Sequence, residues 1–413
     1  MQIQLGYPSP LERERGLGLM ISVQQAKALV AQHCKPLAAK QMPLANALNT
    51  VLAANVFSAI DMPGFNQSAM DGYAICFADY EVNKTLKIFG ESYAGSNKLL
   101  PLQKNTAVRI FTGAPVPAGA DTVVMQEHTK KDGDELTIES PNLFCGLNVR
   151  KQGSEINNGA LALESGTLLT PGAIGFLAGL GFTTVPVHGF PKITIIATGK
   201  ELVTPGNPLL PGQVYESNSL TLKTALQQLQ ITNVKLNWVD DDVDALVIAV
   251  QKALSDSDLI LVTGGVSVGD YDYVIPALKA CDVTTIFHKV KQRPGKPLFF
   301  GKKDDKIIFG LPGNPSSVLS CYYQYVLLAI QKMMNRTNAF IKTFELPIDK
   351  EYTKATGLTH FLKGSYNNEK AKHLTAQESF RLSSFALANC LIEIPEDTEV
   401  VESGQLVTVH VLS

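Results

Sequence analysis

DLILVTGGVSVGDYDY, residues Asp258–Tyr273, begins as a short apolar run and then breaks into glycines and acids. Leu259–Val262 has the length and branched side chains of a buried β-strand, so Gly264 and Gly265 begin the loop after it. Ligands of open α/β sheets bind beyond the carboxyl ends of the strands, where glycines let backbone N–H groups surround an anion. The stretch therefore predicts a ligand site at a strand end.

Three polar residues that follow these glycines favour a phosphate held together with a divalent cation. Ser267 supplies a hydroxyl, and Asp270 and Asp272 supply the hard oxygen ligands that such a cation needs. From these residues alone, the alternative interpretation is a tight turn followed by solvated acids.

A second glycine loop, Gly310–Ser317 (GLPGNPSS), follows another apolar run. Pro312 lies within it, and it leads into a helix start with Asn314 as the expected N-cap and Pro315 at the first helical position. Two such loops at two strand ends predict a single crevice.

The surrounding segments alternate between strand and helix patterns. Strands are expected at Lys192–Ala197 and Val234–Val239, and helices at Leu220–Leu229 and Val243–Leu254. This order predicts a parallel sheet wound with helices on both faces, over residues 190–337.

Charged residues fall in the loops of this doubly wound domain. Glu201 and Asp241 each follow a predicted strand, and Asp242 is expected to cap a helix. Arg293–Pro297 (RPGKP) places the cations Arg293 and Lys296 in a turn stiffened by prolines, one of which is Pro297. Such a turn suits an oxyanion.

The N-terminal part is predicted to be helical. Residues 1–19 have no apolar core of a signal peptide and are expected to form a loose extension. Ser22 and Gln25 form a capping box for a helix Ser22–Lys35, and a second helix is expected at Leu44–Ala54. These two helices are too few to build a core of their own.

The remaining segments read as β-structure, apart from a small-residue helix at Pro171–Leu180. A β-rich domain is expected within residues 59–150, with a hairpin at Asp132–Gly133. Residues 338–413 show short alternating strands and predict a small, barrel-like β-domain.

Composition restricts the class of protein. The chain has 413 residues and a formal net charge of -2, so it carries no basic surface typical of nucleic-acid binding. Its six cysteines form no C-x-x-C pair and fit a reducing cytoplasm. No apolar stretch reaches membrane-spanning length, so no membrane association is expected.

Five motifs in this order resemble the molybdopterin molybdenumtransferase family, to which the E domain of gephyrin also belongs. They are SAMDGYA (Ser68–Ala74), TGAPVP (Thr112–Pro117), TGGVSVGDYDY (Thr263–Tyr273), PGKP (Pro294–Pro297) and LPGNP (Leu311–Pro315). The resemblance runs from about Met20 over nearly the whole chain.

The resemblance implies a multidomain α/β plus β protein. Its parts would be an elongated helical dimerisation element (20–58 and 151–189), the β-rich inserted domain (59–150), the doubly wound domain (190–337) and the C-terminal β-barrel-like domain (338–413). It implies a cytoplasmic homodimer that inserts molybdate into adenylylated molybdopterin, with Mg2+-assisted release of AMP. The molybdopterin adenylyltransferase and molybdoenzyme apoproteins are the partners that it suggests.

The resemblance also assigns site residues. Asp71 and Thr112 match polar positions directed at the substrate, and Glu201, Asp241 and Asp272 match acids around the nucleotide and the metal. The cofactor-binding positions are Gly264, Gly265, Ser267, Arg293, Lys296, Pro297, Pro312, Pro315, Ser379 and Ser383.

Some positions depart from the family pattern. Lys200 stands where an acid is usual, which leaves the number of metal ions open, and Lys363 replaces a usual arginine. The alternative function is a non-catalytic binding or scaffold protein on the same fold. Gephyrin couples its scaffold role to a further domain that this chain does not show, which favours the enzyme.

Overall fold

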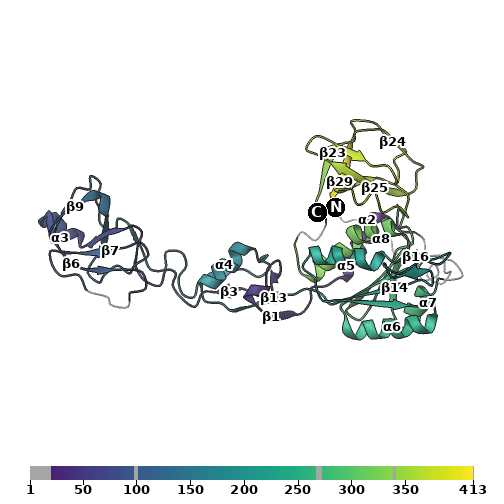
Figure 1. The fold of residues 1–413 in the computed structure, drawn as a ribbon, viewed down its shortest axis with the longest axis horizontal. Helices are drawn as coiled ribbons and strands as arrows, with labels where there is room; N and C mark the ends of the chain where they lie inside the picture. Colours follow the sequence, from purple (N-terminus) through teal and green to yellow (C-terminus); the bar gives the residue numbers. More distant parts are fainter. Residues whose placement is uncertain (1–19, 97–100, 267–271, 338–340, 413) are drawn as a thin grey trace, which may run out of the picture. The chain divides into compact units, whose positions relative to one another are not determined.

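The computed structural model describes residues 20–96, 101–266, 272–337 and 341–412. The chain forms two compact units: unit 1 holds residues 1–40 and 187–413, and unit 2 holds residues 41–186 (Figure 1). The chain passes between them within β1 (Ala39–Pro43) and β13 (Thr184–His188). The predicted extension 1–19 and the predicted ligands Ser267 and Asp270 lie outside the described residues.

Unit 1 contains a six-stranded sheet in the order β17-β14-β18-β22-β21-β19. Its strands are β14 (Ile193–Thr198), β17 (Val234–Val239), β18 (Leu259–Thr263), β19 (Thr284–His288), β21 (Phe299–Lys303) and β22 (Lys306–Leu311). The first four in this order pair in parallel, as predicted. The last two, β21 and β19, are antiparallel to their neighbours. For β21 and β22 the reason is that Lys303 pairs with Lys306 across a two-residue turn, and so short a connection permits only antiparallel pairing.

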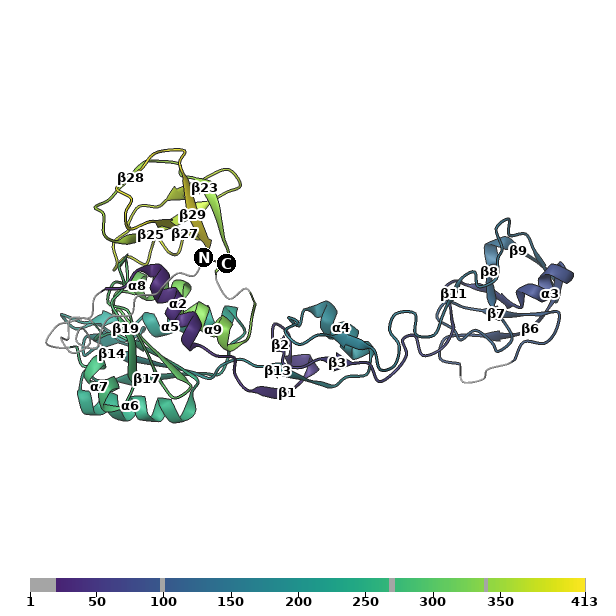
Figure 2. The ribbon, with the colours of Figure 1, turned by 180° about the vertical axis from the view of Figure 1, so that it is seen from behind.

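Helices cover both faces of this sheet, which confirms the doubly wound prediction (Figures 1 and 2). The helices α6 (Val243–Asp256) and α7 (Val274–Ala280) pack on one face. The other face is covered by α2 (Val23–His33), α5 (Asn218–Gln228), α8 (Pro315–Cys321), the π-helical η3 (Tyr322–Val326) and α9 (Leu327–Met333). Two short strands, β15 (Leu202–Val203) and β16 (Val214–Tyr215), pair separately.

The helix α2 packs on the doubly wound domain, whereas the sequence analysis grouped residues 20–58 with residues 151–189 in a dimerisation element. The capping box of Ser22 and Gln25 forms as expected. However, α2 buries Val23, Ala26 and Val30 in the core of the doubly wound domain. Three apolar side chains on one helix face must be buried against another apolar surface, and the sheet together with α9 supplies that surface.

The C-terminal part of unit 1 is a β-domain, as predicted. Its main sheet has the order β20-β25-β27-β29-β23, and β26 pairs with β25. The strands are β20 (Gln292–Arg293), β23 (Thr343–Pro347), β25 (Thr359–Tyr366), β26 (Ala371–His373), β27 (Cys390–Ile394) and β29 (Leu406–Val411), with β24 (Tyr352–Thr353) and β28 (Val400–Val401) as a separate pair. Because β20 belongs to the RPGKP segment, this sheet ties that segment to the C-terminal domain.

Unit 2 contains a second six-stranded sheet in the order β8-β5-β7-β6-β10-β9. Its strands are β5 (Gly72–Ile75), β6 (Thr85–Ser92), β7 (Thr106–Ile110), β8 (Thr122–Met125), β9 (Thr129–Asp132) and β10 (Glu135–Ile138), with α3 (Phe77–Val82) and η2 (Gln126–His128) beside them. The predicted hairpin at Asp132–Gly133 is confirmed. Unit 2 also holds β2 (Val51–Leu52), β3 (Val56–Phe57), β4 (Gln67–Ser68), β11 (Val149–Arg150), β12 (Leu161–Leu163) and α4 (Pro171–Gly179).

The helix predicted at Leu44–Ala54 is wrong. The segment forms the single turn η1 (Leu44–Asn46) and then the strand β2. Asn49 has a left-handed φ of 62°, and the Leu52 N–H donates to the carbonyl of Thr167 at 3.0 Å. Pairing with a distant segment thus overrides the local helix pattern. Within the described ranges, every helix is too short or too polar to cross a bilayer.

Replacing Gly72 by alanine should disrupt the sheet of unit 2. An added Cβ would lie 1.8 Å from the carbonyl oxygen of Val124 on the paired strand, so the two strands must separate. We expect a loss of about 3 kcal/mol of unfolding free energy. As a control, Gly175→Ala in α4 meets nothing within 4 Å and should stabilise the helix by up to about 1 kcal/mol. Equal denaturant midpoints for the two variants would contradict this account.

Candidate functional site

Three loops leave the sheet of unit 1 side by side at its carboxyl edge. They follow β14, β18 and β22, which are neighbours in the sheet. The Gly264 N–H donates to the Leu311 carbonyl at 3.3 Å, and a Cβ on Gly264 would lie 2.4 Å from the carbonyl oxygen of Thr198. The prediction that the two glycine loops lie together is confirmed.

The Gly264–Gly265 corner requires glycine. Both residues have left-handed φ values, 95° and 57°, which other L-residues adopt at a cost. The carbonyl of Gly265 then accepts a hydrogen bond from the Val274 N–H at 3.3 Å, so the chain returns to the start of α7. Asp272 lies two residues before that helix and is half-buried.

The predicted acids lie around these loops. Asp241 accepts a hydrogen bond from the Thr198 hydroxyl, which attaches it to the end of β14. Asp242 accepts from the Ala245 N–H at 2.9 Å and is the helix cap that the sequence predicts. Glu201 is exposed, and its Oε1 lies 3.0 Å from the position that a Cβ on Gly199 would take.

These acids do not form a closed metal cage. Within the parts of the chain that the structure describes, no three His, Cys, Asp or Glu side chains lie close enough to hold a metal ion. Mg2+ commonly uses only one or two carboxylates and takes its other oxygens from substrate phosphates and water. The separate carboxylates of Asp241 and Asp272 beside a glycine corner fit such an open site.

The RPGKP turn carries two exposed cations. The Val290 N–H donates to the Lys296 carbonyl at 2.9 Å and closes the turn at its base. Arg293 and Lys296 are both exposed, and neither forms an ion pair with any described residue. Pro297 is half-buried beside them. The turn therefore presents positive charge that no carboxylate in the described part of the chain neutralises.

The C-terminal domain reaches the second glycine loop through Ser379. The Asn314 side-chain amide donates to the Ser379 hydroxyl at 2.9 Å, and the Ser316 N–H donates to the Ser379 carbonyl at 3.1 Å. Asn314 is the N-cap residue that the sequence predicts, but its side chain makes this contact instead of capping α8. Pro315 takes the first helical position of α8, as predicted, and Pro312 is buried in the loop before it. The predicted residue Ser383 is exposed and lies four residues after Ser379.

Lys363 holds the segment that carries Ser379. Its side chain is 1% exposed, and its ammonium donates to the carbonyls of Ala376, Glu378 and Arg381 at 2.7, 3.2 and 3.0 Å. Burial lowers the pKa of Lys363 to about 8, so the ammonium form with three donors still dominates at neutral pH. This buried cation therefore organises a loop of the site.

Asp71 and Thr112 form a pair in unit 2. The Thr112 N–H and hydroxyl both donate to Asp71 Oδ1, at 2.7 and 2.8 Å. These two hydrogen bonds hold the pKa of the Asp71 carboxyl below its ordinary value. The exposed carboxylate is thus fixed in direction and remains ionised at neutral pH.

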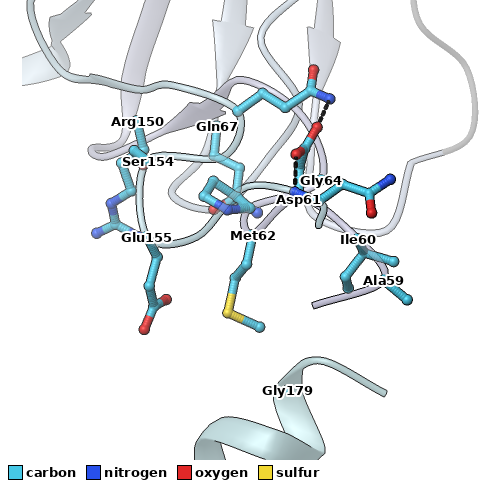
Figure 3. A pocket seen from close by; sticks show the side chains of 13 residues that line it. Ala59, Ile60, Asp61, Met62, Gly64, Gln67, Arg150, Ser154, Glu155 and Gly179 are labelled. Atoms are coloured by element: carbon cyan, nitrogen blue, oxygen red, sulfur yellow. Dashed lines mark hydrogen bonds between the residues drawn. The ribbon is translucent and has the colours of Figure 1, made fainter. Parts of the chain in front are cut away.

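Unit 2 also contains an open hollow of about 840 Å³, which the sequence did not predict. Figure 3 shows Asp61, Arg150 and Glu155 among its lining side chains. Asp61 accepts from the Gln152 side chain and from the Asn158 N–H, both at 2.8 Å, so it braces the loop that forms the wall.

Comparison with known proteins identifies the family. Family models match residues 21–181 (MoeA N-terminal region, domain I and II), 194–332 (probable molybdopterin binding domain) and 345–412 (MoeA C-terminal region, domain IV). A molybdopterin molybdenumtransferase of Haemophilus influenzae is 33% identical over 404 residues, which cover 95% of this chain and 98% of that protein. The chain belongs to the molybdopterin molybdenumtransferase family.

Further members of the molybdopterin molybdenumtransferase family agree in length and fold. The Staphylococcus aureus (strain MRSA252) protein is 31% identical over 398 residues, covering 94% of this chain and 95% of that protein. A solved molybdopterin biosynthesis MoeA protein from Pyrococcus horikosii is 27% identical, with a TM-score of 0.82 over 96% of this chain and 100% of that chain. The multidomain α/β plus β fold is therefore that of the family.

Three supporting roles around these loops escaped the sequence analysis: the link from Asn314 to Ser379, the anchoring of the Ser379 segment by Lys363, and the contact of Gln292 with the RPGKP turn. Asn314 and Ser379 are 65 positions apart, and no local pattern reports such a pairing. For Lys363, the available signals were its place directly after the apolar pair Phe361 and Leu362 of β25 and its replacement of the arginine usual in the family.

Lys363→Met should loosen the Ser379 loop. The change keeps the length of the side chain but leaves three carbonyls without their donor, which should lower the unfolding free energy by about 3 kcal/mol. Hydrogen exchange across residues 374–384 should accelerate. Lys370→Met is the matched control, because it breaks only the exposed Lys370–Asp349 ion pair of the same domain and should change little. Equal effects of the two changes would contradict the anchoring role.

Proposed function

We propose that the chain is a molybdopterin molybdenumtransferase that inserts molybdate into adenylylated molybdopterin, releases AMP and yields molybdenum cofactor. Family membership over nearly the whole chain supports the activity. The observation that carries the site is that Arg293 and Lys296 are exposed, form no ion pair with a described residue, and lie on a turn that packs beside the second glycine loop at Ser317.

The oxyanion half of the site needs cationic and hydroxyl donors. Molybdate is a tetrahedral dianion, and charge-assisted hydrogen bonds from a fixed lysine or arginine bind such groups strongly. In this proposal Lys296 and Arg293 hold the molybdate, while Ser379 and Ser383 approach it from the C-terminal domain. Pro297, Pro312 and Pro315 keep the neighbouring backbone rigid.

The nucleotide half of the site uses the glycine corner and the acids. In this proposal the Gly264–Gly265 corner lies beside the adenylyl phosphate and the Gly265 N–H is the donor, because the Gly264 N–H is bonded to the Leu311 carbonyl. Asp241 and Asp272 would hold Mg2+ together with phosphate oxygens and water, and the predicted third acid, Glu201, does not form a three-carboxylate cluster with them. When bound, Mg2+ offsets the negative charge that develops as the phosphoanhydride breaks. In this proposal Asp71, oriented by Thr112, presents a fixed carboxylate to the substrate.

We also propose that the enzyme acts as a homodimer in the cytoplasm, with the molybdopterin adenylyltransferase and molybdoenzyme apoproteins as transient partners. Unit 2 exposes the large apolar side chains of Phe57 and Leu161, which are paired neighbours on β3 and β12. Exposed apolar groups that cluster in this way are typical of interfaces. All six cysteines are free thiols, which suits a reducing compartment. A monomer mass in sedimentation equilibrium would contradict the dimer.

The proposal is tested by turnover. Purified protein should convert adenylylated molybdopterin and molybdate into AMP and loaded cofactor when Mg2+ is present. Binding of the pterin without any release of AMP would indicate instead a scaffold protein on the same fold.

Asp272→Asn should abolish Mg2+-dependent release of AMP without unfolding the protein. The amide keeps the shape of the side chain but removes a charged oxygen ligand, so the loss should lie in the chemical step. Asp240→Asn, at an exposed acid of a neighbouring loop, should leave the Mg2+ titration unchanged. An Asp272→Asn enzyme with the Mg2+ dependence of the wild type would rule out a metal role for this residue.

Lys296→Ala should raise the molybdate concentration for half-maximal turnover roughly tenfold to a hundredfold. This range corresponds to the loss of a charge-assisted hydrogen bond of about 1.5–3 kcal/mol. The requirement for adenylylated molybdopterin should change much less. Lys291→Ala removes an equal charge from the base of the same turn and serves as the control. Equal effects of Lys296→Ala on both substrates would show that the residue only shapes the turn.

A further inference from the structure

One buried helical segment contacts two loops of the proposed site. The helix α8 begins directly after Asn314 of the second glycine loop, and η3 and α9 continue it without a break. Further along this segment, Cys321 contacts Gly295 of the RPGKP turn, and Tyr325 contacts Gln292 directly before it. A single rigid element thus links the turn to the loop.

A buried glutamine connects this segment to the turn. Gln292 is 1% exposed and immediately precedes the turn. Its side-chain oxygen accepts from the Tyr325 hydroxyl, and its amide nitrogen donates to the carbonyls of Pro294 and Gly295, both at 3.1 Å. Burial holds the pKa of Tyr325 far above its ordinary value, so its hydroxyl remains a donor. Because unpaired carbonyls are costly in the interior, these bonds fix the path of the turn.

The fit around Gly295 leaves no room for a shift of the turn toward the helix. Gly295 has a left-handed φ of 88°, and an added Cβ would lie 2.5 Å from Cys321 Sγ and 2.8 Å from Gln292 Nε2. The Cys321 thiol, whose pKa burial raises to about 12, donates to the Gly295 carbonyl at 3.7 Å. Lys296 follows Gly295 directly, so its backbone position depends on this packing.

The π-helical segment η3 supplies two buried tyrosines with different partners. The Tyr322 hydroxyl donates to the Ala225 carbonyl at 3.0 Å, on α5. The Tyr325 hydroxyl donates to Gln292. Both side chains are at most 2% exposed. π-helical turns occur frequently at functional sites. Because only the Tyr325 hydroxyl reaches Gln292, Tyr322 serves as a control for the loss of a buried hydroxyl from the same segment.

We propose that Gln292 and Tyr325 are positioning residues that hold the RPGKP turn so that Lys296 meets the molybdate oxyanion. Neither residue contacts the substrate. They act through the carbonyls of Pro294 and Gly295. This inference rests on the proposed role of Lys296.

Tyr325→Phe, compared with Tyr322→Phe, tests the inference. Each change removes one buried hydroxyl from the same helical segment, but only Tyr325 is linked to the turn. We expect Tyr325→Phe to raise the half-saturating molybdate concentration about three- to tenfold, with the requirement for adenylylated molybdopterin unchanged. Hydrogen exchange across residues 289–298 should accelerate in this variant. Tyr322→Phe should match the wild type in both measurements.

Three results would overturn the inference. The first is an equal shift of the molybdate requirement in both tyrosine variants, and the second is unchanged exchange across the turn in Tyr325→Phe. The third is faster hydrogen exchange across the turn in Tyr325→Phe, with the half-saturating molybdate concentration unchanged both in that variant and in Lys296→Ala. That outcome would refute the proposed role of Lys296 as well and leave the contacts purely structural. If Tyr325→Phe fails to fold, Gln292→Met, which removes both donors at nearly equal volume, replaces it in the same measurements.

Discussion

Parallel pairing of three strands places the loops of the proposed site beside one another. Ala197 at the end of β14 pairs with Thr263, and Thr263 pairs with Leu311 at the end of β22. A shift of this register by one residue would turn the buried side chains of β18 to the opposite face of the sheet. Because β18 is fully buried on both faces, the register is strongly determined, and the three loops are fixed with it.

Polar contacts then connect the other parts of the site to this sheet edge. Ser379 of the C-terminal domain bonds to Asn314 and Ser316, and Lys363 holds the segment around Ser379. Gln292 does the same for the RPGKP turn. Lys363 and Gln292 are buried donors that are satisfied by main-chain carbonyls of these loops, which makes displacement of the loops costly.

Local signals in the sequence predicted the elements that depend on near neighbours. The capping box of Ser22, the helix start at Asn314–Pro315 and the Asp242 cap are of this kind. The segment Leu44–Ala54 was misassigned because its hydrogen bonds go to residues more than a hundred positions later. The contacts of Gln292 and Lys363 depend in the same way on tertiary structure. Resemblance to a family supplied the site residues and marked the position of Lys363, but it did not supply these contacts or Gln292.

The central claim is that the oxyanion binds where the RPGKP turn, the second glycine loop and the Ser379 segment meet. Anomalous diffraction from crystals of the protein soaked in molybdate measures this directly. The account predicts a molybdenum peak within hydrogen-bonding reach of Lys296 and of the Ser379 hydroxyl. A peak only in the hollow lined by Arg150 and Glu155, with none beside Lys296, would contradict it.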